Sequence, residues 1–189
     1  MEINRDRLFE TLNALGELGV NETGRSRLAA SDEDKAGRDY VVRLMKEAGL
    51  EVVADKIGNL FGIWQDGSNS GERCVMTGSH VDSVINAGKY DGCLGVLSGI
   101  EAVRTLRENG YAPKRPIVVG AFTNEEGVRY QPDMMGSLVY AGGMPLEDAL
   151  DAVGTDGTRL GDELARIGYA GTAEPGFLQP ECFIELHIE

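Results

Sequence analysis

Two histidines are the only imidazoles in this chain of 189 residues, and each stands close to carboxylates. His80 lies in the segment Gly-Ser-His-Val-Asp, and His187 lies in Glu-Leu-His-Ile-Glu. Between them stand Asp91, in Lys-Tyr-Asp-Gly, and the adjacent pair Glu125 and Glu126, in Thr-Asn-Glu-Glu-Gly. Imidazole nitrogens and carboxylate oxygens are ligands that suit zinc or manganese. The sequence therefore presents a candidate metal site.

Two of the carboxylates have ordinary structural explanations as well as chemical ones. In an extended segment, Asp82 points the same way as His80 and could orient a metal-bound imidazole or neighbouring groups. The alternative is an exposed histidine beside a solvated aspartate. Asp91 precedes a glycine-punctuated helix, so it could cap that helix or bridge two metal ions. The two functions compete for the same oxygens, so an Asp91 that caps the helix would be a poor bridge.

The remaining candidates leave similar alternatives. Glu125 and Glu126 follow an apolar run, and their side chains diverge in an extended backbone, so one could bind metal while the other transfers a proton. A solvated acidic turn is the simpler explanation. His187 lies between Leu186 and Ile188 in a predicted final strand, where a core histidine would be the default. The occurrence of all these residues near strand ends favours a metal site.

Strands alternate with helices along the chain, which predicts an α/β fold, a three-layer αβα sandwich around a mixed, largely parallel central sheet. The carboxyl ends of such strands are where open α/β sheets place their sites. The least regular stretch is 129–136. The predicted strands are 51–54, 59–64, 72–77, 116–122 and 181–188, and the predicted helices are 5–18, the segment between Ser31 and Gly49, 94–106, 144–153 and 158–167.

The composition limits the classes of partner. A hydrophobic content of 42% and 189 residues indicate one folded domain, and a net charge of −13 argues against nucleic acid or an anionic membrane as a partner. No apolar run approaches the roughly 20 residues of a membrane span, and the N-terminus lacks the pattern of a secretion signal. Three scattered cysteines, Cys74, Cys93 and Cys182, are interpreted as thiols, and a reducing, cytoplasmic setting fits best.

Four ordered motifs resemble those of a known family. They are Gly78–Ser83, Gly88–Gly92, Thr123–Gly127 and Glu185–Glu189, and they are similar to the dinuclear-metal amidohydrolases that include N-carbamoyl-L-amino acid hydrolase, allantoate amidohydrolase and bacterial beta-ureidopropionase. These enzymes belong with the aminoacylase-like metallopeptidases and have a zinc-exopeptidase-like fold. The resemblance runs from about Leu8 to the last residue and includes the segment 55–62. The pair Gly136–Ser137 resembles a stretch near the substrate region, with no assigned function.

The resemblance implies a function for each matched residue. His80 and His187 would hold one divalent ion, Asp91 would bridge to a second, and Glu126 would bind that second ion. Glu125 would be the general base, and Asp82 would support the metal-bound His80. The two ions would be zinc or manganese, with cobalt or nickel as alternatives. The substrate would be a small carbamoyl or ureido compound, and the full-length enzyme would be a homodimer.

In the family, a lid and dimerisation domain follows the last motif, and a later segment supplies another histidine ligand. The resemblance therefore implies that residues 1–189 are the N-terminal part of a catalytic domain, inactive alone, with a sheet edge and part of the core exposed. Two other hypotheses stay open. One is a non-catalytic metal-binding or interaction module, and the other is an aminopeptidase with related ligands.

Overall fold

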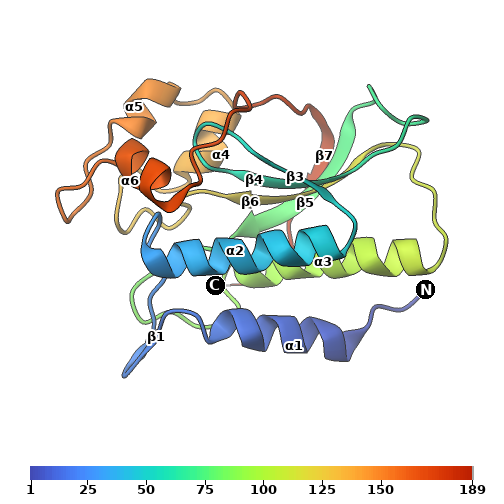
Figure 1. Ribbon diagram of the computed structural model, residues 1–189, viewed down its shortest axis with the longest axis horizontal. Helices are drawn as coiled ribbons and strands as arrows, with labels where there is room; N and C mark the ends of the chain where they lie inside the picture. Colours follow the sequence, from blue (N-terminus) through green and yellow to red (C-terminus); the bar gives the residue numbers. More distant parts are fainter. Residues whose placement is uncertain (189) are drawn as a thin grey trace.

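The centre of the molecule is a mixed five-stranded sheet, in a computed structural model that describes residues 1–188 (Figure 1). Its order is β3-β4-β6-β5-β7. β4 pairs antiparallel with β3 and β6, whereas β5 runs parallel to both β6 and β7. The strands are β3 (Glu51–Ala54), β4 (Leu60–Trp64), β5 (Cys74–His80), β6 (Ile117–Phe122) and β7 (Pro180–Ile184).

Helices cover both faces of this sheet and complete the three predicted layers. α2 and α3 lie along one face and α1 packs on α3, while α4 lies on the opposite face with α5 and α6 beside it (Figure 1). A short hairpin follows α1, formed by the two-residue strands β1 (Val20–Asn21) and β2 (Gly24–Arg25). The helices are α1 (Arg5–Gly16), α2 (Asp32–Glu47), α3 (Cys93–Glu108), α4 (Met135–Tyr140), α5 (Leu146–Leu150) and α6 (Leu160–Ile167).

Local sequence explains where the first helices begin and which faces they bury. The side chain of Asn4 accepts a hydrogen bond from the backbone N–H of Arg7, and Ser31 caps α2 in the same way. Leucines at helical spacing then form the inner face of α1, and all three are buried: Leu8, Leu12 and Leu15. On the other side of the sheet, rings of β4, β6 and α4 pack together: Phe61, Phe122 and Tyr140.

The structure differs from the sequence-based expectations at three places that matter for the site. β5 ends at His80, three residues beyond the strand predicted over 72–77, so His80 is the last residue of the strand and does not follow it. α4 lies partly in the stretch expected to be irregular. β7 ends at Ile184, so His187 follows the strand and does not lie in it. The ladder of β7 with β5 stops at the pair of Thr77 with Ile184, and beyond it the Ser79 hydroxyl donates to the carboxylate of Glu185 at 2.6 Å.

One edge of the sheet carries exposed apolar side chains, as the resemblance implied. Within the described residues, β7 is the last strand of the sheet and has β5 as its neighbour on one side only. Phe183 and Ile184 on this strand are 43% and 60% exposed.

None of the helices in residues 1–188 is long and apolar enough to cross a membrane. Glu189, the last residue of the fourth motif, lies outside the described residues.

Candidate metal centre

Strand topology brings the predicted ligands to one edge of the sheet. β5 runs parallel to β6 and β7, so the carboxyl ends of all three meet at the same edge. His80 is the last residue of β5, Glu125 and Glu126 follow β6, and His187 follows β7. Asp91 reaches this edge from the loop that leads into α3. Residues more than 100 positions apart in sequence therefore share one site.

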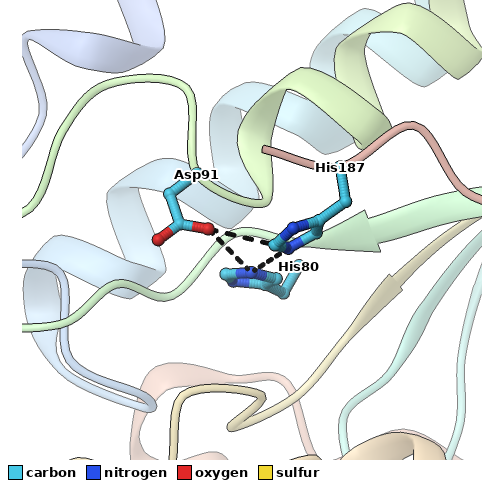
Figure 2. Close-up of side chains that lie close together, drawn as sticks. All are labelled: His80, Asp91 and His187. Atoms are coloured by element: carbon cyan, nitrogen blue, oxygen red, sulfur yellow. Dashed lines mark hydrogen bonds and ion pairs between the residues drawn. The ribbon is translucent and has the colours of Figure 1, made fainter. Parts of the chain in front are cut away.

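Three of these side chains converge on a single point (Figure 2). The Nε2 atoms of His80 and His187 lie 3.4 Å apart, and each lies 3.6 Å from Oδ1 of Asp91. Ligands around a tetrahedral zinc ion, with bonds of about 2.0–2.2 Å, lie about 3.3–3.6 Å from one another. The spacing of these three atoms therefore fits one divalent ion.

A backbone contact fixes which nitrogen His80 can offer to a metal. Nδ1 of His80 lies 2.9 Å from the backbone carbonyl oxygen of Asp82. A carbonyl can only accept, so Nδ1 carries the proton and the lone pair of a neutral imidazole stays on Nε2. On the other side of the ring stands Gly92, where a Cβ would lie 2.4 Å from Nε2 of His80. His80 is thus held on both sides with Nε2 toward Asp91 and His187.

Asp91 does not cap the helix that follows it. The N-cap of α3 is Gly92, and no side chain makes a capping hydrogen bond there. One carboxylate oxygen of Asp91 faces both imidazoles, and the other points away from them (Figure 2). The structural alternative for this residue is therefore absent, and its second oxygen is available to another ion. Glu126 approaches Asp91 and also accepts a hydrogen bond from the Val84 N–H at 3.3 Å.

The carboxylate of Asp82 lies within ion-pair distance of His80 but forms no hydrogen bond to the ring. It is fully buried, and its Oδ1 lies 3.9 Å from Nδ1 of His80. Its two oxygens instead accept the backbone N–H groups of Glu125 and Glu126, each at 3.3 Å. The backbone of Asp82 thus orients the imidazole, while its side chain holds the turn that carries the two glutamates.

Electrostatics at the site indicate a deficit of positive charge. Burial alone would lower the pKa of His80, but the carboxylates of Asp91, Asp82 and Glu125 outweigh it and raise that pKa to about 9. Burial and the neighbouring carboxylates raise the pKa of Glu126 to about 7 and also raise that of Glu125. A divalent cation would supply the missing charge, since oxygen-rich acidic clusters are the usual environment of such ions.

The site opens into a cavity of about 420 Å³. Two lining residues escaped the sequence reasoning, Asp133 and Met134, because they belong to the stretch without regular periodicity. Met134 has a left-handed backbone (φ 50°), and its N–H donates to the Glu125 carbonyl at 2.6 Å. Oε2 of Glu125 lies 3.4 Å from Nε2 of His80, beside the point where the three ligands converge. A small molecule in this cavity would meet two of the three converging residues, Asp91 and His187, together with Glu125.

Comparison with known proteins identifies the family of the chain. Residues 75–189 match the family model for peptidase family M20/M25/M40. The chain is 41% identical to an N-carbamoyl-L-amino-acid amidohydrolase of Rhizobium meliloti, covering 99% of this chain and 45% of that protein. It is 40% identical to a ureidoglycolate hydrolase of Arabidopsis thaliana, covering 87% of this chain and 36% of that protein.

Solved structures show the same fold. An amidase of the hydantoinase/carbamoylase family from Burkholderia multivorans superposes with a TM-score of 0.95 at 42% identity, covering 100% of this chain and 46% of that one. The chain thus spans less than half the length of these relatives. The fold class and the resemblance predicted from the motifs are both confirmed. The chain belongs to peptidase family M20/M25/M40.

Proposed function

We propose that this chain carries the metal-binding part of an amidohydrolase that cleaves the C–N bond of linear amides, of the N-carbamoyl-L-amino acid, ureido acid or allantoate type. The observation that supports it is the convergence of His80, Asp91 and His187 at metal-ligand spacing, with Glu125 beside them. Relatives named for carbamoyl-amino acid and ureidoglycolate hydrolysis support the substrate class.

Each residue has a distinct function in this proposal. His80 and His187 would hold one divalent ion, Asp91 would be shared with a second, and Glu126 would hold that second ion. When bound, such ions supply positive charge that acidifies water and polarises the carbonyl group. Zinc or manganese suits the donor set, with cobalt or nickel as alternatives. Asp82 keeps His80 and the glutamate turn in register through the contacts described above.

Glu125 is the proposed general base. Its Oε2 takes a proton from the attacking water, whose oxygen forms a bond with the carbamoyl or amide carbon. The protonated carboxyl then donates that proton to the nitrogen as the C–N bond breaks. Burial raises the pKa of Glu125, which brings a carboxylate closer to the range in which it can both accept and return a proton.

The 189-residue chain gives a second ion only the carboxylates of Asp91 and Glu126 in this assignment. The relatives are more than twice as long. We therefore propose that the remaining ligand and the substrate-binding groups come from a region that corresponds to the part of the relatives not matched by this chain. The chain alone would then have little or no activity. The homodimer implied by the resemblance, and the reducing, cytoplasmic setting inferred from the three cysteines, are further parts of this proposal for the full-length enzyme.

The experiment combines a metal titration with assays of hydrolysis. We expect Zn²⁺ or Mn²⁺ to bind the chain, and the full-length enzyme to hydrolyse N-carbamoyl-L-amino acids but not unblocked dipeptides. Glu125→Gln should retain metal and lose at least about 100-fold in rate. Glu181→Gln, which alters an exposed carboxylate on β7, is the matched control. Retained activity in Glu125→Gln would refute the base assignment.

The same assays separate the alternatives. Preferred hydrolysis of dipeptides would favour the aminopeptidase. Binding of one ion without turnover, even after the chain is mixed with the unmatched part of a relative, would favour a non-catalytic module.

A further inference from the structure

Two motifs without an assigned function meet directly behind the turn that carries Glu125. One is the segment 55–59, Asp-Lys-Ile-Gly-Asn, which joins β3 to β4. The other is Gly136, in the first turn of α4. The sequence separates them by 77 residues, yet the amide nitrogen of the Asn59 side chain donates to the Gly136 carbonyl at 3.0 Å. Asn59 is completely buried at this junction.

The Asn59 amide links three separate segments of the backbone fold. Its oxygen accepts the N–H of Thr123 at 2.9 Å, and its nitrogen donates to Oδ2 of Asp55 at 2.9 Å as well as to Gly136. Oδ1 of Asp55 accepts the Asn59 backbone N–H at 2.8 Å. Since the β4–β6 ladder ends at the pair of Leu60 with Ala121, this side chain continues the pairing past the last residue of the strand.

Position 136 has no room for a side chain, because the Asn59 amide occupies the space that a Cβ would need. A Cβ on Gly136 would lie 2.2 Å from Oδ1 of Asn59 and 2.5 Å from the Thr123 nitrogen. The Gly136 N–H also donates to the Thr123 carbonyl at 2.8 Å. The start of α4 is therefore seated directly on the residue that follows β6.

These contacts fix both ends of the loop that holds Glu125. Thr123 stands two residues before Glu125, and the intervening Asn124 has a left-handed backbone (φ 52°) that turns the chain toward the metal ligands. Gly136 closes the same loop. We propose that Asn59, oriented by the Asp55 carboxylate, is a positioning residue for Glu125 and Glu126. The purpose of this positioning rests on the proposed function, whereas the contacts of Asn59 do not depend on it.

The experiment compares Asn59→Ala with Asn69→Ala in the 189-residue chain. Asn69 is a matched control, since it is also buried and links backbone groups, with Asp66 N–H donating to its oxygen and its nitrogen donating to Pro113. Two quantities are measured: the visible d–d spectrum and affinity of bound Co²⁺, and hydrogen–deuterium exchange of the amides in 123–136. Asp55→Asn is the second variant and serves if Asn59→Ala does not fold. It keeps the side-chain shape and removes the acceptor for the Asn59 amide.

We expect Asn59→Ala to change the Co²⁺ spectrum, to weaken Co²⁺ binding by about tenfold or more, and to speed exchange in 123–136. Asp55→Asn should cause the same changes to a smaller extent, and Asn69→Ala should leave the spectrum and the affinity unchanged. A wild-type spectrum and affinity in both Asn59→Ala and Asp55→Asn would overturn the inference, as would equal effects in Asn69→Ala. Absence of Co²⁺ binding by the wild type would refute the proposed metal site, and exchange in 123–136 would then decide whether Asn59 holds the loop.

Discussion

Replacement of Gly92 by alanine should disable the metal site while the fold survives. Gly92 has φ 61°, and a Cβ there would lie 2.4 Å from Nε2 and Cε1 of His80. Because a Cβ rarely approaches another atom within 3.4 Å, the ring must shift by about 1 Å. Zinc–nitrogen distances tolerate about 0.2 Å, so such a shift removes His80 as a ligand. We expect Zn²⁺ affinity to fall at least about 100-fold, or about 2.7 kcal/mol.

The matched control is Gly110→Ala, which also has a positive φ (68°) and no atom within 4 Å of the added Cβ. Gly92, at φ 61° and ψ −47°, lies outside the left-handed helical region. Gly110→Ala should lose about 1–2 kcal/mol of unfolding free energy and Gly92→Ala at least as much, measured by urea denaturation without metal. Isothermal titration with Zn²⁺ should then show wild-type affinity for Gly110→Ala alone. If Gly92→Ala bound Zn²⁺ within about threefold of the wild type, the steric reasoning would be refuted.

Three further predictions concern residues behind the site. Arg38→Met leaves the buried carboxylate of Asp34 without its ion pair, which has an N···O distance of 2.7 Å. The free energy of unfolding, measured by urea denaturation, should fall by about 3–5 kcal/mol, and a loss below about 1 kcal/mol would contradict this prediction. Arg27→Met leaves buried carbonyl groups without their donor, including that of Val81, which accepts from Nε of Arg27 at 2.6 Å. The free energy of unfolding should fall by about 3 kcal/mol or more, measured again by urea denaturation. Burial raises the pKa of Asp55 to about 6, so the folded state holds this proton more tightly than the unfolded state. The free energy of unfolding should therefore fall from about pH 4 to about pH 6 by more in the wild type than in Asp55→Asn, and equal slopes would refute this assignment.

The positions of the candidate metal ligands could be predicted because they depend on strand order and strand ends. An apolar run that stops at a polar residue marks the carboxyl end of a buried strand, as it does at His80 and before Glu125. When such strands are parallel neighbours, their ends meet without any further information from the sequence. The register of His80 with Phe122 places Glu125 three residues beyond that pair, at the same edge.

Other features depend on partners that no local pattern reveals. α4 has six residues, too few to show helical periodicity, and Gly136 is fixed against Thr123 by contacts between distant segments. His187 was predicted inside a strand because residues 181–188 alternate in polarity. The strand ends at Ile184, and beyond it the Ser79 hydroxyl binds the Glu185 side chain where the ladder would have continued. Alternation describes which side chains face outward, but it does not determine where backbone pairing stops.

Asp82 shows that a residue of a short motif can act through contacts that lie outside the motif. Its position two residues after His80 predicts a residue that orients the imidazole or neighbouring groups. The structure gives the imidazole to the backbone carbonyl and the carboxylate to two N–H groups that lie 43 and 44 residues away. One residue therefore couples the loop after β5 to the loop after β6. An asparagine at this position would keep the carbonyl contact with His80 but replace one of the two acceptors by a donor. The glutamate turn would then be released while His80 stayed in place, so the geometry assigns the Asp82 carboxylate to the glutamate turn and its carbonyl to the imidazole.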